Sequence, residues 1–268
     1  MKTRYTFHTV LLIALLLGGL FHFSACTSDS KRAETQISVS TPPRPAGQTD
    51  VVGLTCEPIE TVRIGFIGLG IMGESMCENI VKKHDDTVYV FDFVKEKVEL
   101  LASKGAAACA DSVELAEKSD VIISMVPKSE HSRSVYTAIL GVLNESKICI
   151  DMSTIDPSVS VDISGMVKKT GAQFMDAPVV KSKPAAVAGK LGIYMGGDED
   201  VCEKMRPILL YMGENVIRMG GNGKGLVMKI CHNALVTQIQ NGVNETLALA
   251  QKNGISIPDY ATAISYGG

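Results

Sequence analysis

The chain has 268 residues, enough for one large domain or a large and a small one, and its 26 basic and 29 acidic residues give a net charge of -3. It contains no block of consecutive Lys and Arg residues of the kind that follows a phosphate backbone, so no nucleic-acid partner is expected. The 7 cysteines are scattered without CxxC spacing and the 5 histidines do not cluster, which argues against a metal site and a disulfide framework.

Residues 1–26 have the order of an export signal. Lys2 and Arg4 precede an apolar run over residues 10–21, and two small residues stand directly before Cys26. The run is shorter than the roughly 20 residues that span a bilayer. It predicts a signal peptide, and "FSAC" at residues 23–26 also resembles a bacterial lipoprotein signal, which implies Cys26 as the lipidation site and a membrane as the attachment surface. An organelle targeting peptide and a wrongly assigned start codon remain as alternatives.

Residues 27–60 are rich in Ser, Thr, Pro and charge, a composition that predicts a disordered linker. After them, short apolar runs alternate with stretches in which apolar residues recur every three or four positions. The predicted strands cover residues 62–68, 87–92, 120–126, 147–153 and 173–179. The predicted helices cover residues 74–84, 94–105, 112–120 and 157–171. This alternation predicts an α/β domain over residues 61–224 with a doubly wound parallel sheet of the Rossmann type.

A longer helical pattern begins at Gly225 and ends at Asn253-Gly254, with Pro258 beyond it. It predicts that residues 225–268 start a second, all-α domain.

A glycine-rich segment follows the first predicted strand and opens the first predicted helix. Its six residues match GxGxxG: Gly68, Leu69, Gly70, Ile71, Met72 and Gly73. In this setting the glycines allow a tight turn and a close approach to a pyrophosphate, and Asp92 at the end of the next strand suits an adenosine ribose. The charge of Asp92 would repel the 2'-phosphate of NADP, so NAD is the expected cofactor. Lys95 leaves NADP open, and a glycine-rich turn without a ligand is the alternative.

Five segments together resemble the β-hydroxyacid dehydrogenases, and most closely their 3-hydroxyisobutyrate dehydrogenase branch. They are "IGFIGLGIMG", "DMSTIDPSVS", "FMDAPV", "GKLGIYMGG" and "GNGKGLVMKICHN", in the order and spacing of the family from about Val62 onward. The resemblance implies an oxidoreductase that moves a hydride between NAD(P) and a short β-hydroxy acid. The expected reaction partner is therefore a small hydroxy acid or semialdehyde.

The resemblance also implies roles for individual residues. Lys229 matches the general acid/base of the family, and Asn233 lies on the same helix face, four residues on. Ser153 matches a residue that contacts the substrate during catalysis. Three further residues match cofactor contacts: Val126, Pro127 and Thr154. Without the resemblance, Lys229 would be interpreted as a solvated lysine and the corner at Asp156-Pro157 as a helix cap.

Two departures from the family pattern leave the substrate and the activity open. After "DAPV" the family has Ser-Gly-Gly, whereas this chain has Val180-Lys181-Ser182. Lys181 and Ser182 are still assigned to the substrate, and "KSKPAA" partly resembles the related glyoxylate and succinic semialdehyde reductases. The second departure is length, because the helical domain of the family continues well beyond residue 268.

The short helical region predicts an exposed apolar stripe made of Leu226, Val227, Ile230, Leu235, Ile239 and Val243. The chain is then either a fragment or finds partners for this stripe in another chain, as a homo-oligomer would. Two functions remain: a dehydrogenase with Lys229 as acid/base, and an NAD-binding protein without turnover. The location is also unresolved, because an NAD site and unpaired cysteines suit the cytoplasm whereas the leader suits a membrane.

Overall fold

The computed structural model describes residues 62–267. The predicted leader (1–26), its Cys26 and the predicted linker (27–60) lie outside the described residues. The chain divides into two compact units between Ile239 and Gln240. The predicted domain boundaries, including the one at residues 224 and 225, stay predictions.

The first unit is built on a mixed sheet. Within the described residues the strands lie in the order β3-β2-β1-β4-β5-β6-β8-β7, and β9 pairs with β8. The strands are β1 (Ile64–Ile67), β2 (Val88–Phe91), β3 (Ala107–Ala108), β4 (Val121–Ser124), β5 (Ile148–Asp151), β6 (Gln173–Asp176), β7 (Val179–Val180), β8 (Leu191–Gly196) and β9 (Gly213–Gly220). All pairs from β3 to β6 are parallel, which confirms the predicted doubly wound sheet.

The edge of the sheet beyond β6 differs from the prediction. Strand β8 runs antiparallel to both β6 and β7, so the sheet is parallel only in part. The expected strand over 173–179 divides at Ala177-Pro178 into β6 and β7, because Pro178 lacks the N–H group that a ladder needs. The apolar pattern predicts neither the strands β3, β8 and β9 nor the helices α5 (Ser129–Ile139), α7 (Lys183–Val187) and α8 (Glu199–Leu209).

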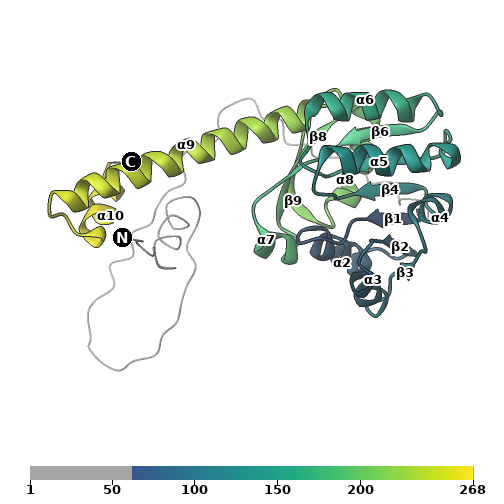
Figure 1. The fold of residues 1–268 in the computed structure, drawn as a ribbon, viewed down its shortest axis with the longest axis horizontal. Helices are drawn as coiled ribbons and strands as arrows, with labels where there is room; N and C mark the ends of the chain where they lie inside the picture. The colour runs from purple at the N-terminus through teal and green to yellow at the C-terminus, as the bar shows by residue number, and fades with distance from the viewer. Residues whose placement is uncertain (1–61, 268) are drawn as a thin grey trace, which may run out of the picture. The chain divides into compact units, whose positions relative to one another are not determined.

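Helices cover both faces of the sheet (Figure 1). They are α2 (Gly73–Lys83), α3 (Lys95–Ala102), α4 (Ser112–Lys118), α5 (Ser129–Ile139), α6 (Pro157–Lys168), α7 (Lys183–Val187), α8 and the first part of α9 (Lys224–Lys252). Successive strand residues serve opposite faces, as the period of two requires. Ile123 packs in the cluster that contains α2, α3 and α8 side chains, whereas Ile122 packs in the cluster that contains α4, α5 and α6 side chains. The result is one buried sheet between two apolar cores.

The beginning of α6 confirms the predicted cap. The Asp156 carboxylate accepts a hydrogen bond from the Ser158 N–H group at 2.7 Å, and Pro157 takes the first helical position.

The predicted apolar stripe on α9 is exposed at four of its six residues, Val227, Ile230, Leu235 and Ile239. Leu226 is 1% exposed and belongs to the core cluster of α4, α5 and α6, and Val243 is partly buried. Leu226 is buried because it lies in the first turn of α9, where the helix packs against the sheet unit.

The second unit contains the remainder of α9 and α10 (Ile257–Ser265). Ser256 caps α10 by accepting a hydrogen bond from the Asp259 N–H group, and the hydroxyl groups of Thr246 and Tyr260 are 2.6 Å apart. No helix among residues 62–267 has the length and apolar character needed to cross a membrane.

Candidate active site

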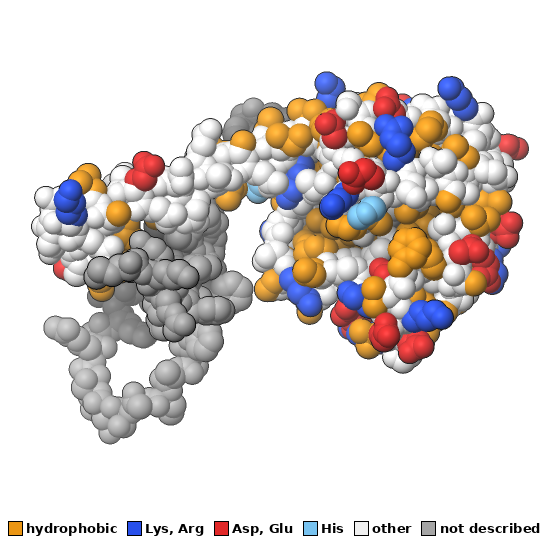
Figure 2. All heavy atoms as spheres, viewed as in Figure 1, with side chains coloured by type: hydrophobic (Ala, Val, Ile, Leu, Met, Phe, Trp, Pro, Cys, Tyr) orange, Lys and Arg blue, Asp and Glu red, His pale blue; other side chains and the backbone are white. Residues whose placement is uncertain are grey.

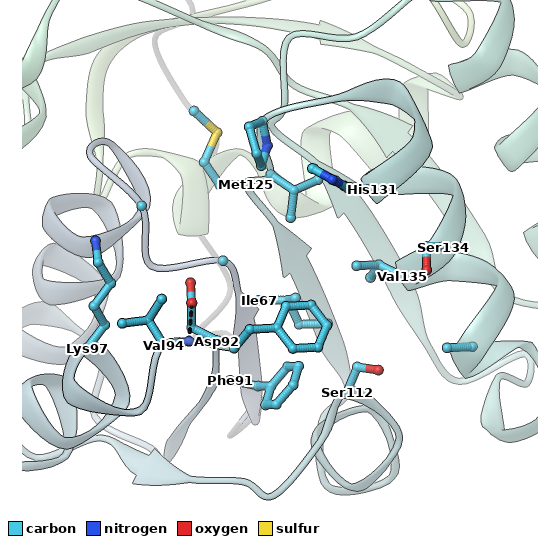
Figure 3. A pocket seen from close by; sticks show the side chains of 16 residues that line it. Ile67, Phe91, Asp92, Val94, Lys97, Ser112, Met125, His131, Ser134 and Val135 are labelled. Carbon is cyan, nitrogen blue, oxygen red and sulfur yellow. Dashed lines mark hydrogen bonds between the residues drawn. The ribbon is translucent and has the colours of Figure 1, made fainter.

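A cavity of about 450 Å³ lies where the strand order reverses, at the carboxyl ends of β1, β2 and β4. Doubly wound sheets bind ligands at this switch point. Figure 3 shows Asp92, Val94 and Lys97 on one side of the cavity, with His131 and Val135 of α5 on the other. The predicted cofactor residues that line it are Gly68, Gly70, Asp92, Val126 and Pro127.

The three glycines of the predicted loop differ in what a side chain at each position would meet. Gly68 has a φ of +95°, and a Cβ atom there would collide with the Met125 carbonyl oxygen. A Cβ atom on Gly73 would collide with the Gly68 carbonyl oxygen. A Cβ atom on Gly70, by contrast, would meet no protein atom within 4 Å. Gly68 and Gly73 therefore shape the turn, whereas the space beside Gly70 is open.

The same loop leaves backbone donors free at the N terminus of α2. Among the described residues, the N–H groups of Gly70, Ile71, Met72 and Gly73 have no hydrogen-bond partner, and no side chain caps the helix. Ile71 is 74% exposed, whereas Leu69 is fully buried. Free N–H groups and the positive end of the helix dipole suit an anion such as a pyrophosphate.

Two charged side chains hold the peptide groups on either side of Leu69. The Leu69 N–H group donates to Asp92 Oδ2 at 2.6 Å, and Lys97 Nζ donates to the Leu69 carbonyl oxygen at 2.7 Å. The other oxygen of Asp92 accepts a bond from the Val94 N–H group at 2.8 Å. The sequence alone does not indicate Lys97, whose only signal is its place in the first turn of α3. Lys95, which leaves NADP open in the sequence, is exposed and does not line the cavity.

Apolar side chains form the remaining wall of the cavity. Phe91 and Phe93 meet edge to face with ring centroids 5.4 Å apart, and Phe93 is 91% exposed. Ile67, Val94 and Val135 complete this wall. Figure 2 shows hydrophobic side chains gathered on this face of the sheet unit, with charged groups around them. A wall of this kind suits a flat heterocycle such as adenine.

Ser153 links the ends of β4 and β5 from the interior. It is fully buried, and its Oγ atom accepts a hydrogen bond from the Val126 N–H group at 2.9 Å. The Ser153 N–H group donates to Asp151 Oδ1 at 3.0 Å, and burial raises the pKa of Asp151. Thr154, the next residue, is exposed. The Ser153 hydroxyl group thus supports the Val126-Pro127 segment that lines the cavity.

Lys229 and Asn233 lie on α9 and do not line the cavity. Lys229 is half-buried, and within residues 62–267 its ammonium group forms no ion pair. Burial lowers the pKa of Lys229. Asn233 is exposed. A lysine with a lowered pKa is a group that can exchange a proton.

Lys181 and Ser182 lie between β7 and α7, also away from the cavity. Lys181 has a φ of +79°, so it keeps the left-handed conformation that glycine adopts most easily. Its Nζ atom lies 2.7 Å from Glu214 Oε1. The Lys181 ammonium group, which the sequence assigns to the substrate, is therefore paired with a carboxylate on β9. Ser182 is exposed and precedes α7.

Among residues 62–267, no three His, Cys, Asp or Glu side chains group together as metal ligands would. The five cysteines of this part are free, and four of them are buried.

The strand order, the glycine loop, Asp92 and the cavity define a dinucleotide-binding Rossmann domain. Consistent with this, residues 63–221 match a family model described as the NAD binding domain of 6-phosphogluconate dehydrogenase.

Two relatives and one solved structure narrow the class. Mouse mitochondrial 3-hydroxyisobutyrate dehydrogenase is 38% identical over 195 residues, or 72% of this chain and 58% of that enzyme. The NAD-dependent L-serine dehydrogenase of Pseudomonas aeruginosa is 35% identical over 196 residues, or 72% of this chain and 65% of that enzyme. The structure of Mycobacterium tuberculosis 3-hydroxyisobutyrate dehydrogenase with L-serine is 30% identical with a TM-score of 0.74, covering 77% of this chain and 70% of that one.

The chain belongs to the β-hydroxyacid dehydrogenase family, as its sequence motifs predicted. It spans 58% of the length of the mouse enzyme.

Proposed function

We propose that this chain transfers a hydride between NAD and the carbinol carbon of a short β-hydroxy acid. The observation that carries the proposal is Lys229, a half-buried lysine without an ion-pair partner in residues 62–267, on a chain with an NAD-binding domain. Hydride removal from a carbinol requires a group that takes the hydroxyl proton. Lys229 supplies that group.

The residues around the cavity fit NAD. The free N–H groups from Gly70 to Gly73 would hold the pyrophosphate, the apolar wall would hold the adenine, and Asp92 would accept bonds from the ribose hydroxyl groups. When bound, the nicotinamide accepts or returns the hydride. Val126, Pro127 and Thr154 are proposed as further cofactor contacts.

The chain's own side chains would handle the proton and the substrate. Neutral Lys229 Nζ takes the hydroxyl proton in the oxidation, and protonated Lys229 returns it in the reduction. The lowered pKa of Lys229 increases its neutral fraction at a given pH. Asn233 is proposed to hold the same substrate oxygen. Ser153, Lys181 and Ser182 are proposed to bind the rest of the substrate, which requires the Ser153 hydroxyl and the Lys181 ammonium groups to exchange their present partners.

A second reaction fits the unusual segment at Val180-Lys181-Ser182. A glyoxylate or succinic semialdehyde reductase would use the same hydride transfer and the same Lys229, but its substrate would be a different carboxylic acid. The positive φ of Lys181 supports this alternative, because the chain keeps a glycine-like turn but adds a cation there. An NAD-binding protein without turnover is the third possibility.

An activity assay with a panel of hydroxy acids tests the proposal. The full chain is mixed with NAD and, separately, 3-hydroxyisobutyrate, glycerate, 4-hydroxybutyrate and L-serine, and NADH absorbance is followed. We expect NADH to form with at least one hydroxy acid. A folded sample that binds NADH but produces none with any substrate would favour the binding-only function.

Cofactor preference should depend on Asp92, and cofactor binding in general on Lys97. We expect Asp92→Asn to weaken NADH binding about tenfold and NADPH binding less, because it removes a charged acceptor for the ribose and a repulsive charge. Lys97→Gln should weaken binding of both cofactors, since Lys97 holds the Leu69 carbonyl group. Titration of nucleotide fluorescence measures both constants. The matched control is Lys95→Gln on the same helix, and an equal effect of Lys95→Gln would contradict the assignment to Lys97.

The leader and the assembly can be tested in the same way. Mass spectrometry of the amino terminus from native membranes tests the predicted leader, since a lipid on Cys26 would place the protein at a membrane and cleavage without lipid would indicate export. Light scattering of the full chain tests the homo-oligomer that the exposed residues of α9 suggest.

A further inference from the structure

The N terminus of α9 has no side-chain cap of its own. The residue before the helix is Gly223, which has a φ of +84° and whose carbonyl oxygen accepts the first helical bond from Val227. A helix normally satisfies its first N–H groups with an oxygen of the residue at this position. Gly223 has no side chain to provide one.

Asp176 of β6 supplies the missing oxygens. Its Oδ1 atom accepts a bond from the Gly223 N–H group at 2.6 Å, and its Oδ2 atom accepts one from the Leu226 N–H group at 3.0 Å. Leu226 is the third residue of α9, the position that a capping side chain usually serves. The carboxylate also places a negative charge at the positive end of the helix dipole.

Asp176 is closely packed by its surroundings. The side chain is 0% exposed. A Cβ atom on Gly196 would lie 2.5 Å from Asp176 Oδ1, and one on Gly225 would lie 2.8 Å from Oδ2. The two glycines therefore clear the space that the carboxylate occupies between β8 and α9.

We propose that Asp176 is a positioning residue, whose buried carboxylate caps α9 in place of a Gly223 side chain and thereby fixes Lys229 in the second turn of the same helix. The proposal rests on the proposed function of Lys229 and adds the residue that holds it. Asp176 does not touch the reacting atoms and acts only through the helix.

Protonation of Asp176 should release part of this cap. Burial raises the pKa of Asp176 to about 6, so the carboxylate is ionised at neutral pH and becomes protonated as the pH falls through that value. The titratable groups that face it are Asp151 from β5 and Cys202 from α8. Asp151 disfavours its ionisation, and burial raises the pKa of Cys202 to about 11, which keeps that thiol neutral. In the first turn of α9, the charged residue is Lys224, which is exposed and packs against Gly220.

Protonation of Asp176 weakens the cap, but through this group it does not lower the overall stability of the fold. Because the pKa of Asp176 is higher in the folded chain than its ordinary value of 3.8, its contribution to stability is fully present below about pH 4 and is lost as the pH rises through about 6. Loss of activity below pH 6 would then not be explained by loss of folding through this group.

The experiment compares the full chain with Asp176→Asn and with the control Asp198→Asn. Asp198 is an exposed carboxylate that pairs with Lys168, so its replacement removes the same charge outside the site. We expect hydrogen exchange at the Gly223 and Leu226 amides to become about tenfold faster in Asp176→Asn only. We also expect acetylation of Lys229, mapped by mass spectrometry, to change by about threefold or more relative to Lys95.

Turnover in the reduction direction adds a second readout. Lys229 works there in its protonated form, so its own titration does not lower the rate on the acidic side of the pH profile. The wild-type kcat should fall as the pH drops through about 6. In Asp176→Asn, kcat at neutral pH should be about tenfold lower without this inflection, and the KM for NADH should not change.

The outcomes separate the two proposals. Unchanged exchange and unchanged Lys229 acetylation in Asp176→Asn would overturn the positioning role, whatever the turnover. A wild-type chain with no turnover, in which Asp176→Asn still alters both, would support the positioning role and count against the proposed reaction.

Discussion

Replacing Lys229 by methionine is expected to lower kcat by about 10²- to 10⁴-fold, the range that a general acid/base contributes. Methionine keeps the unbranched shape and most of the apolar volume of the lysine side chain but cannot carry a proton. Lys229 is half-buried and does not line the cavity that would hold the adenosine half of NAD. The Kd for NADH should therefore change by less than about twofold.

The measurement is kcat with the best hydroxy acid of the panel, together with NADH titration of the same sample. Lys224→Met is the matched control, because Lys224 lies on the same helix and is exposed. Turnover of Lys229→Met at the level of Lys224→Met would exclude Lys229 as the acid/base. The pH profile is a further check: burial lowers the pKa of Lys229, so the oxidation rate should reach its plateau below the ordinary value of 10.5.

The parts of the site that depend on local spacing could be predicted from the sequence. Gly68, Gly70 and Gly73 stand at fixed positions between a strand and a helix, and Asp92 ends the next strand, so the parallel topology alone brings them together. Strands β1, β2, β4, β5 and β6 were predictable because each is a short run rich in apolar residues, whereas β3, with only Ala107 and Ala108, was not.

The parts that depend on contacts between distant segments could not be predicted in this way. Lys97 donates to a carbonyl group 28 residues earlier in the chain, and nothing in its helical pattern indicates that partner. Asp176 caps a helix that begins 48 residues later. The antiparallel pairing of β8 escaped prediction because strand direction is set by which neighbour the chain returns to, which the apolar pattern does not encode.

Ser153 illustrates a different limit of sequence reasoning. Its motif indicates a role in substrate binding, but the side chain is buried and bonded to the Val126 N–H group. A hydroxyl group can hold a neighbouring loop and later exchange that bond for a ligand, and the sequence does not distinguish the two states. The same holds for Lys181, whose ammonium group is paired with Glu214.

The second large effect is expected at the glycine loop, where Gly70→Ala and Gly73→Ala should fail in different ways. A Cβ atom on Gly73 collides with the Gly68 carbonyl oxygen, so Gly73→Ala should destabilise the fold by about 1–3 kcal/mol and abolish NADH binding. A Cβ atom on Gly70 meets no protein atom, and Gly70 does not have a positive φ. Gly70→Ala should therefore leave stability unchanged or raise it by up to about 1 kcal/mol.

Binding to Gly70→Ala decides whether the open space beside the loop belongs to the cofactor. If the pyrophosphate approaches the backbone there, the added methyl group should weaken NADH binding by about tenfold or more while the unfolding midpoint stays in place. Gly141→Ala is the control, since its Cβ atom also meets no protein atom and lies outside the cavity. Denaturant unfolding and NADH titration of the three variants separate the effects. Neither Gly70→Ala nor Gly141→Ala should lose stability, so weaker NADH binding in Gly70→Ala alone would be a direct effect of the added methyl group. Gly70→Ala with wild-type affinity would mean that the cofactor does not lie against this loop.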